Sequence, residues 1–425
     1  MHAQEMQNVI FAKNSVIRIL YVSYDGLLEP LGESQVVAYM EGLAERTRMT
    51  VISFEKDRDC CDPARKEAMR SRLEHKGIEW IPLRYHKQPP IISTAFDVCC
   101  AMIAGMLLVR SGRFQIVHAR GYVPALLALA FKHLWGAKFL FDMRGFWADE
   151  KVDAGHWRKD SMIYRITKGW ERRFFESADA IVSLTQAGVA AFPSLGYRLR
   201  SQTSIAVIPT CTDLRRFTHG TRDEALAARL GLDGHLVIGC TGTISNWYLR
   251  QPMLECLAYL AQHLDRVKIL MVTHEDHRKL TLDANRAGIP DEQLVLVKVQ
   301  FSAMPAYLRL MDFGLFFIKP CFSKKGSSAT KLGEFLATGI PVVINNGVGD
   351  SGRIVQEHGV GVVLPETGAR DIAASVVKIK ELLSDPLVRI RCRETAEQYF
   401  DLQRGVEMYG ALYAQLGGAL ASNHT

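Results

Sequence analysis

Short apolar runs alternate with amphipathic stretches in the first half of the chain. The first run, residues 16–22, stops at a polar segment that contains glycine, and apolar positions with helical spacing begin at Ser34. Another apolar run follows at 49–54. Strand, loop, helix and strand in this order form the βαβ unit of a parallel sheet. The same pattern predicts later strands at 78–83, 114–118, 138–141, 180–184 and 205–208.

A polar, charge-rich stretch after Pro209 interrupts this alternation, which restarts near Gly234. The second half has a helical pattern at 252–264 and strand-like runs at 236–240, 267–272, 294–299, 314–318, 341–344 and 360–364. Residues 371–416 are helical by pattern and contain no strand-like run. We therefore predict two doubly wound, Rossmann-like α/β domains that face a cleft. The boundaries are 16–212 for the acceptor-side domain, 213–235 for a linker, 236–395 for the donor domain and 396–418 for a helical tail that could cross back to the first domain.

Composition excludes several classes of protein. The 425 residues carry 52 Lys and Arg against 45 Asp and Glu, a net charge of +7, and 48% of them are hydrophobic. These values are typical of a globular protein and not of a disordered chain. The mild positive charge favours an anionic partner such as a phosphorylated substrate or a lipid surface. Because the chain has no dense block of Lys and Arg, we expect no nucleic-acid partner.

The longest apolar stretch, residues 91–109, contains Ser93, Thr94 and Asp97. These polar residues favour a buried or amphipathic helix over a membrane span. Residues 1–14 lack the cationic and apolar regions of a secretory signal, so we expect a cytoplasmic protein. The nine cysteines are spread along the chain without a Cys-x-x-Cys motif, which indicates reduced thiols and neither disulfides nor zinc.

The segment 319–341 has the chemistry of a phosphate-binding site. It follows a strand and opens a helix, and its small residues at 326–330 would let backbone N–H groups approach an anion. Lys319 and Lys331 supply full charges. Glu334 lies three residues after Lys331 on the same face of the helix and could accept hydrogen bonds from sugar hydroxyls. The alternative is a solvated Lys/Glu pair on a surface helix.

Two further segments lie where predicted strands end. The loop at 141–157 contains the candidate acceptor-side residues, whose carboxylates, guanidinium and aromatic ring suit recognition of a polyol: Asp142, Arg144, Trp147 and Asp149. The alternative is an ordinary hydrated loop with one buried aromatic residue. His118 and Arg120 end another strand and could reach the cleft, although a single histidine there is more often a hydrogen-bonded core residue.

The loop at 25–34 leads into a helix and contains Gly32. It lacks Gly-x-Gly-x-x-Gly and the lysine of a P-loop, so it supports neither a dinucleotide site nor an ATPase. Asp57 and Asp59 form a carboxylate pair of the kind that holds a metal and a diphosphate. They stand in a charged run, which favours a solvated face.

Together these segments resemble the GT-B-fold glycosyltransferases of the retaining family 4, across nearly the whole chain. The resemblance rests on the glycine loop that contains Gly32, the 207–217 segment, and the helix and strand at 331–343. The 141–157 stretch is similar to one seen in a bacterial branch of that family. No single motif among them is specific, whereas their combination is.

The resemblance implies that Glu334 binds the donor ribose and that the 326–331 loop holds diphosphate and sugar. The candidate donor-binding residues are Gly32, Thr243, Lys319, Gly326, Ser327, Ser328, Thr330 and Glu334. Two features depart from the family. Gly326 stands where the first of two glutamates is expected, and the family's diphosphate-binding Arg and Lys have no clear match at 241–248. Lys331, together with Lys319, is expected to supply that charge.

The resulting hypothesis is transfer of a sugar from a nucleoside diphosphate sugar to a hydroxyl of a glycan or lipid-linked acceptor, in cell-surface polysaccharide synthesis. Lys331 and helix N-termini would stabilise the departing diphosphate, and His118 and Arg120 would face the donor sugar or acceptor. The resemblance implies retention of configuration, no metal and no further cofactor.

Two alternatives stay open: a GT-B-fold nucleotide-sugar epimerase, and a catalytically inactive nucleotide-sugar-binding partner of another transferase. Peripheral contact with the inner membrane face is expected only by analogy, because bacterial members of such families often act on lipid-linked glycans.

Overall fold

Among the residues that the structure describes, thirteen parallel strands form two sheets, one in each half of the chain. The computed structural model describes residues 16–56, 62–111 and 114–421. The first sheet has the order β3-β2-β1-β4-β5-β6-β7. Its strands are β1 (Ile17–Ser23), β2 (Thr47–Glu55), β3 (Glu79–Arg84), β4 (Ile116–Arg120), β5 (Lys138–Asp142), β6 (Ala180–Ser183) and β7 (Ser204–Val207).

The second sheet has the order β10-β9-β8-β11-β12-β13. Its strands are β8 (Leu236–Thr241), β9 (Val267–Val272), β10 (Leu294–Val297), β11 (Phe313–Phe316), β12 (Val342–Asn345) and β13 (Gly361–Leu364). In each sheet the strand order reverses beside the first strand, which is the arrangement of a doubly wound fold. The predicted pair of doubly wound α/β domains is confirmed. Each predicted strand coincides with an observed one to within two residues at both ends.

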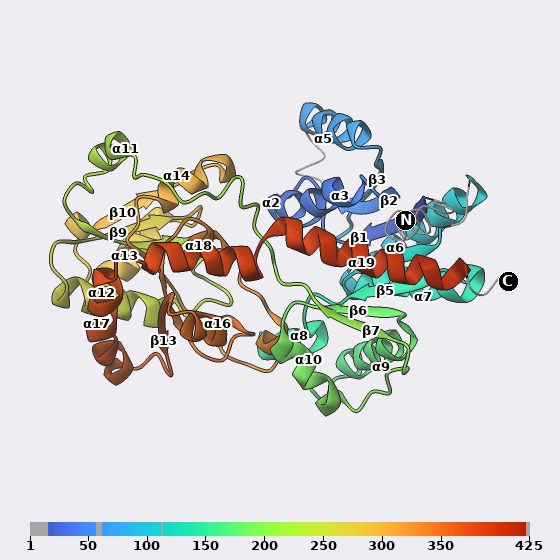
Figure 1. Cartoon of the computed structure of the whole chain (residues 1–425). Helices are drawn as coiled ribbons and strands as arrows, with labels where there is room; N and C mark the ends of the chain where they lie inside the picture. The colour runs from blue at the N-terminus through green and yellow to red at the C-terminus, as the bar shows by residue number, and fades with distance from the viewer. Residues whose placement is uncertain (1–15, 57–61, 112–113, 422–425) are drawn as a thin grey trace, which may run out of the picture.

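Helices cover both faces of the first sheet (Figure 1). One face packs against α3 (Ala38–Leu43) and α19 (Leu402–Ala421), and the other against α6 (Pro90–Ser111), α7 (Tyr122–Trp135) and α9 (Met162–Ser177). The remaining helical segments of this domain are α2 (Pro30–Gly32), the π-helix η1 (Glu33–Val37), α5 (Pro63–His75), α8 (Trp147–Asp153), α10 (Gln186–Ala191) and the 3-10 segment η2 (Phe192–Leu195).

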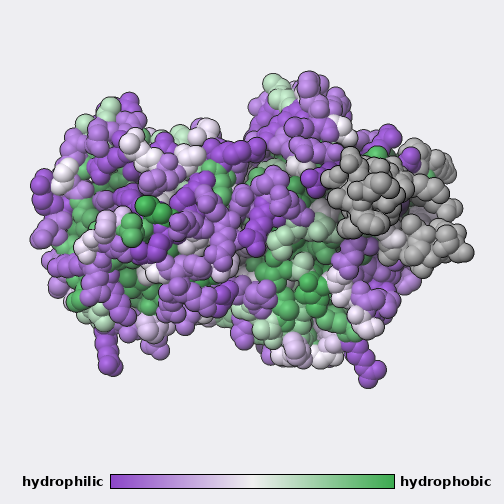
Figure 2. All heavy atoms as spheres, in the orientation of Figure 1, coloured by the Kyte–Doolittle hydropathy of each residue, from purple (hydrophilic) through white to green (hydrophobic). Residues whose placement is uncertain are grey.

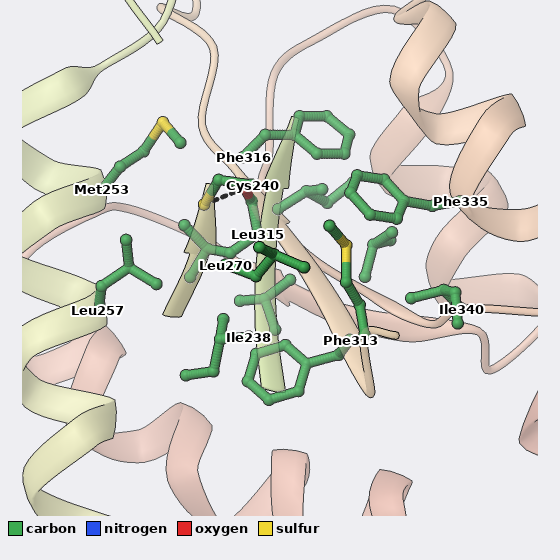
Figure 3. Packing of buried hydrophobic residues seen from close by; sticks show 14 of the residues in the cluster. Ile238, Cys240, Met253, Leu257, Leu270, Phe313, Leu315, Phe316, Phe335 and Ile340 are labelled. Carbon is green, nitrogen blue, oxygen red and sulfur yellow. Dashed lines mark hydrogen bonds between the residues drawn. The ribbon is translucent and has the colours of Figure 1, made fainter. Parts of the chain in front are cut away.

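The second domain has a single large apolar core. Side chains from β8, β9 and β11 interdigitate there with side chains from neighbouring helices (Figure 3). Its α-helices are α11 (Glu224–Arg229), α12 (Arg250–His263), α13 (His277–Arg286), α14 (Met304–Leu308), α15 (Thr330–Ala337), α16 (Ser351–Glu357), α17 (Ala369–Ser384) and α18 (Val388–Tyr399). Three short 3-10 segments are η3 (Asp291–Gln293), η4 (Phe301–Ala303) and η5 (Ser323–Gly326).

The chain passes between the domains at two places that lie side by side. The Thr212 N–H donates to the Phe400 carbonyl at 2.7 Å, and the Leu402 N–H donates to the Thr212 carbonyl at 3.1 Å. After this contact α19 runs along the first domain and packs against α3 (Figure 1). Its inward residues, among them Tyr409 and Tyr413, are buried in the core of that domain. The predicted return of the tail to the first domain is therefore confirmed.

The apolar run at 91–109 is helical, as predicted, but its surroundings differ from the prediction. Ile91–Val109 within α6 is long and apolar enough to cross a membrane by length and composition, and 22% of it is buried. One face packs on the domain and the other is both apolar and exposed, so the helix is neither buried nor amphipathic.

The cysteines of the described residues carry no disulfide: all seven are free. Cys60 and Cys61 lie outside the described residues, as does the carboxylate pair Asp57 and Asp59.

Candidate active site

A cavity of about 690 Å³ lies between the two domains. From the first domain it is lined by Glu33, Ser34 and Gln35, which follow β1 in the first loop and η1. From the second domain it is lined by Thr330 and Glu334 of α15. A cleft beyond the carboxyl ends of parallel strands is where doubly wound domains bind ligands, and the volume suits a small-molecule site.

The position of α15 is fixed by its apolar face. Leu332, Phe335 and Leu336 are buried in the core of the second domain. The ring of Phe335 lies over the backbone of β11 at Gly314, where an added Cβ would be 2.6 Å from the ring (Figure 3). Because only glycine leaves room for this ring, α15 sits close to the sheet. The helix therefore holds Lys331 and Glu334 in fixed positions at the cleft.

Lys331 is buried, with 8% of its surface exposed. Its Nζ donates to the Thr243 carbonyl at 2.8 Å and lies 3.5 Å from the centroid of the Tyr248 ring. Burial lowers the pKa of Lys331 to about 7, and burial raises the pKa of Glu334 to about 7. The alternative of a solvated surface pair is wrong for Lys331. Strongly shifted groups of opposite charge beside a cleft are typical of a functional site.

Glu275, after β9, organises the loop that follows β8. Its Oε1 accepts hydrogen bonds from the Thr243 hydroxyl at 2.6 Å, from the Ile244 N–H at 2.8 Å and from the Ser245 N–H at 3.1 Å. These bonds lower the pKa of Glu275 in spite of its partial burial. Arg250 pairs with the other carboxylate oxygen. The loop is thereby held with its Thr243 carbonyl directed at Lys331.

Sequence reasoning missed Glu275, Arg250 and Tyr248. A signal was available for Glu275, because it follows the strand adjacent to β8 and so had to lie beside Thr243 at the same sheet edge. The ring of Tyr248 and the pairing of Arg250 depend on tertiary contacts that no spacing in the sequence shows.

The segment around Gly326 packs against the first domain instead of lining the cavity. A Cβ at Gly326 would lie 3.2 Å from the Gly145 Cα and 3.3 Å from the Phe146 ring. The Ser328 hydroxyl accepts from the Thr210 N–H at 3.2 Å, and the Ser328 carbonyl accepts from the Thr210 hydroxyl at 3.1 Å. The expected phosphate cradle is thus corrected for Gly326 and Ser328. Their small size allows two backbones to meet, which also explains why no glutamate occupies position 326.

Lys319 belongs to the same contact between domains. Its Nζ donates to the Asp153 carbonyl at 2.8 Å, and the Asp153 carboxylate accepts from the Ser323 N–H at 3.0 Å. Lys324 pairs with Glu150 at 3.1 Å. Lys319 is thus engaged by a residue at the end of α8, and its expected contribution to a diphosphate site stays a prediction.

His118, Arg120 and Asp142 form a buried polar cluster at the ends of β4 and β5. Asp142 has no exposed surface, and its Oδ2 lies 3.7 Å from Arg120 Nη1 and 3.6 Å from His118 Nε2. Oδ2 also accepts from the Tyr409 hydroxyl at 3.0 Å. Burial opposes ionisation, but the nearby Arg144, His118 and Arg120 hold the pKa of Asp142 below its usual value. The carboxylate is therefore charged and compensated.

The His118 side chain does not reach the cleft. It is 1% exposed, and its Nδ1 lies 2.6 Å from the Tyr413 hydroxyl beneath α19. Burial lowers the pKa of His118. The expectation that it faces the donor sugar is corrected: it is the hydrogen-bonded core histidine of the alternative interpretation. Arg120 is 5% exposed, and its Nε lies 3.8 Å from Asp25 at the surface.

Trp147 and Asp149 are held inside the first domain. The Asp149 carboxylate accepts from the Tyr164 hydroxyl at 2.8 Å and from Lys168 at 2.9 Å. The Trp147 ring packs 5.4 Å from the ring of Trp157. These contacts fix α8 on α9, and neither residue lines the cavity between the domains.

Among the described residues, no group of three His, Cys, Asp or Glu side chains could hold a metal.

Residues 32–211 match the family described as "Glycosyl transferase 4-like domain". The chain is a GT-B glycosyltransferase. The resemblance to that class, drawn from the motifs, is confirmed by this match together with the fold. No curated protein matches the sequence of the glycosyltransferase.

Several solved structures share the fold of this glycosyltransferase. A glycosyltransferase from Rickettsia africae aligns with a TM-score of 0.69 at 13% identity, over 95% of this chain and 99% of that one. Sucrose-phosphate synthase from Thermosynechococcus elongatus aligns with a TM-score of 0.71 at 14% identity, over 95% and 100%. HepE from Anabaena, solved with UDP-glucose, aligns with a TM-score of 0.66 at 16% identity, over 96% and 100%. At these identities the likeness shows the fold alone.

Of the predicted site residues, Thr330 and Glu334 line the cavity of the glycosyltransferase. Lys331 lies behind them with Thr243. Gly32 is not part of the lining, because an added Cβ there would lie 1.9 Å from the Gly26 carbonyl oxygen and glycine is needed to close the first loop. The Ser327 N–H donates to the Lys324 carbonyl at 3.2 Å and so closes the η5 turn, and Ser327 does not line the cavity.

Proposed function

We propose that this glycosyltransferase moves a sugar from a nucleoside diphosphate sugar to a hydroxyl of a glycan or lipid-linked acceptor, in the synthesis of cell-surface polysaccharide. The observation that carries the proposal is the cavity between the domains, with Glu334 in its wall and the buried Lys331 beside it. A carboxylate suits the hydroxyls of a ribose, and a buried ammonium suits the charge of a diphosphate.

The proposed roles follow from the geometry of α15. Glu334 accepts hydrogen bonds from the nucleoside, while Lys331 moves from the Thr243 carbonyl towards the diphosphate oxygens. The negative charge of the ligand raises the pKa of Lys331 from about 7, so that its ammonium form dominates when the donor is bound. Retention of configuration and independence from metal are proposed from the resemblance to family 4.

The test is thermal unfolding with UDP, GDP, ADP and CMP in turn. A ligand at about 100 times its dissociation constant stabilises the folded state by roughly 2.7 kcal/mol. UDP is tested first, because the similarly folded HepE was solved with UDP. One nucleotide should raise the melting temperature of the wild type and leave Lys331→Ala unchanged.

The matched control is Lys325→Ala. This lysine lies in the same segment but its side chain is exposed. The control should respond to the nucleotide as the wild type does. If no nucleotide stabilises the wild type, or if Lys331→Ala responds fully, the donor site is assigned wrongly.

One observation favours a second candidate, an inactive donor-binding partner of another transferase. Gly326 replaces the first family glutamate, and a Cβ there would lie 3.2 Å from the Gly145 Cα, so a side chain requires the two domains to shift apart. Such a protein would bind the nucleotide sugar and transfer nothing. Incubating the labelled donor with a membrane extract that contains acceptors separates the two functions, and incubation without acceptor detects an epimerase.

A further inference from the structure

Three helices form one layer on the outer side of the first domain. α6 packs against α7, and α7 packs against α9, all on the sheet face opposite to α3 and α19 (Figure 1). The outward surfaces of these helices therefore face away from the rest of the molecule. We call this surface the α6/α9 face and infer that it docks on an anionic lipid bilayer.

The outward side of α6 is an uninterrupted apolar strip. Ile92, Phe96, Cys99, Ile103 and Met106 follow at spacings of three or four and are all exposed. Within Ile91–Val109 every exposed residue is apolar. Ile103 and Leu107 expose 56% and 57% of their surface to water. A contiguous apolar patch of this kind marks an interaction site in a water-soluble fold.

α9 presents apolar and cationic residues together. Met162, Ile166 and Trp170 are four residues apart on one side of the helix and are 72%, 55% and 37% exposed. Arg165 and Arg173 are exposed beside them, and the Arg173 guanidinium lies 4.8 Å from the centroid of the Trp170 ring. Aromatic and aliphatic side chains among arginines are typical of a helix that lies in the membrane interface.

The charge of the chain is concentrated in the segments that build this surface. The described residues 84–109 and 158–173 contain eight Lys and Arg against three Asp and Glu, a surplus of five where the whole chain has a net charge of +7. Two of the three acids, Asp97 and Glu171, are fully buried, and Asp160 pairs with Arg158 at 2.8 Å. Anionic headgroups therefore complement the rim of the apolar strip.

A bilayer fits the strip better than a protein partner does. Protein interfaces carry about one hydrogen bond per 100–200 Å². The exposed residues of Ile91–Val109 offer no side-chain oxygen or nitrogen for such bonds. Acyl chains require none, and the flanking cations meet phosphate groups at the surface.

α6 also contacts the loop after β1, on the cleft side of the first domain. Asp97 of α6 accepts a hydrogen bond from the Tyr24 hydroxyl at 2.9 Å, and Tyr24 belongs to the loop after β1. The next residue, Asp25, lies 3.8 Å from Arg120. A bilayer bound at α6 would thus lie near the loop that leads to the cavity, where a lipid-linked acceptor could arrive.

The experiment is sedimentation of the full chain with vesicles, without nucleotide or acceptor, so the result does not depend on the proposed transfer. Wild type should bind vesicles of phosphatidylcholine with phosphatidylglycerol, and high salt should weaken this binding. The double variant Ile103→Glu/Leu107→Glu should bind at least about tenfold more weakly, since two apolar side chains leave the acyl region.

The matched control is Val377→Glu/Leu387→Glu, which changes two equally exposed apolar residues, at 61% and 56%, on the second domain. Figure 2 shows that much of the visible surface of this domain is hydrophilic. The control should bind as the wild type does. Arg165→Glu/Arg173→Glu should reduce binding to anionic vesicles.

Three results would overturn the inference: no binding of wild type to anionic vesicles, equal losses in the α6 variant and the control, or a loss that accompanies unfolding in circular dichroism. Sedimentation velocity without lipid tests whether a second copy of the chain binds this face instead. If wild type self-associates and Ile103→Glu/Leu107→Glu does not, the face binds a second copy of the chain and the lipid assignment is wrong.

Discussion

Replacing Lys331 with methionine should stabilise the free protein while removing donor binding. Burial lowers the pKa of this lysine from 10.5 to about 7. At roughly 1.4 kcal/mol per pKa unit, the buried charge costs about 4 kcal/mol of folding free energy near neutral pH. Methionine has a similar shape and no charge, so Lys331→Met removes this cost.

Part of the gain is offset. The ammonium group loses its hydrogen bond to the Thr243 carbonyl and its contact with the Tyr248 ring. Its loss also raises the pKa of Glu334 further, since Lys331 opposes the effect of burial there. Together these losses reduce the gain in the free energy of unfolding by about 2–3 kcal/mol, which leaves a net stabilisation of about 1–2 kcal/mol. The melting temperature should rise by roughly 2–8 °C.

The stability of the wild type depends on pH through Lys331. Between pH 7 and 10.5 the unfolded chain holds a proton on Lys331 that the folded chain has released, so wild-type stability rises with pH in this range. The advantage of Lys331→Met is therefore largest below about pH 7 and shrinks as the pH rises. Calorimetry at several pH values, with and without the selected nucleotide, measures both effects.

A matched control is Lys324→Met. This lysine is equally buried, at 6% exposure, but it pairs with Glu150 at 3.1 Å and lies 3.7 Å from the Trp247 ring centroid. Its loss should destabilise the protein. If Lys331→Met lowers the melting temperature of the free protein as Lys324→Met does, the reasoning from burial is refuted. A nucleotide response that persists in Lys331→Met would refute the donor site.

Three other predictions concern different parts of the molecule. Above about pH 7 the affinity of the wild type for the nucleoside diphosphate should fall by up to tenfold per pH unit, because Lys331 must take up a proton before the ligand binds. Calorimetric titration of Lys331→Arg should show no such fall. Tyr413→Phe should cost about 1–3 kcal/mol in urea unfolding, since buried His118 loses its 2.6 Å partner; an unchanged midpoint would contradict this. Gly326→Glu should move the two domains apart, because an added Cβ lies 3.2 Å from the Gly145 Cα. Small-angle scattering should then give a larger radius of gyration. An unchanged radius together with restored sugar transfer would contradict this prediction.

The strands could be predicted because each one is a short apolar run between polar loops. Strands that are buried on both faces, such as β1 and β12, consist almost wholly of apolar residues. The distance along the chain between successive parallel strands requires crossover helices. The face of α15 that carries Lys331 and Glu334 could also be located, since the helical repeat places residues three apart together. These are local properties of the sequence.

The errors came from contacts between segments distant in the chain. His118 ends a strand at the expected edge, but its exposure is decided by α19, which begins 284 residues later. Gly326 has the composition of an anion-binding loop, and only the position of Gly145 in the other domain reveals its structural use. Sequence patterns give the ends of strands, whereas the segments that cover those ends follow from tertiary packing.

The bridge between Thr212 and Asp401 also defines the topology of the whole molecule. The chain leaves and re-enters the first domain at one point, so residues 213–400 are an insertion into that domain between β7 and α19. The inserted domain could be excised and the ends at 212 and 401 joined by a short turn without lengthening the path of the chain. Because both crossings meet at this point, we expect any relative motion of the domains to be a rotation about the bridge, with a displacement that grows with distance from it.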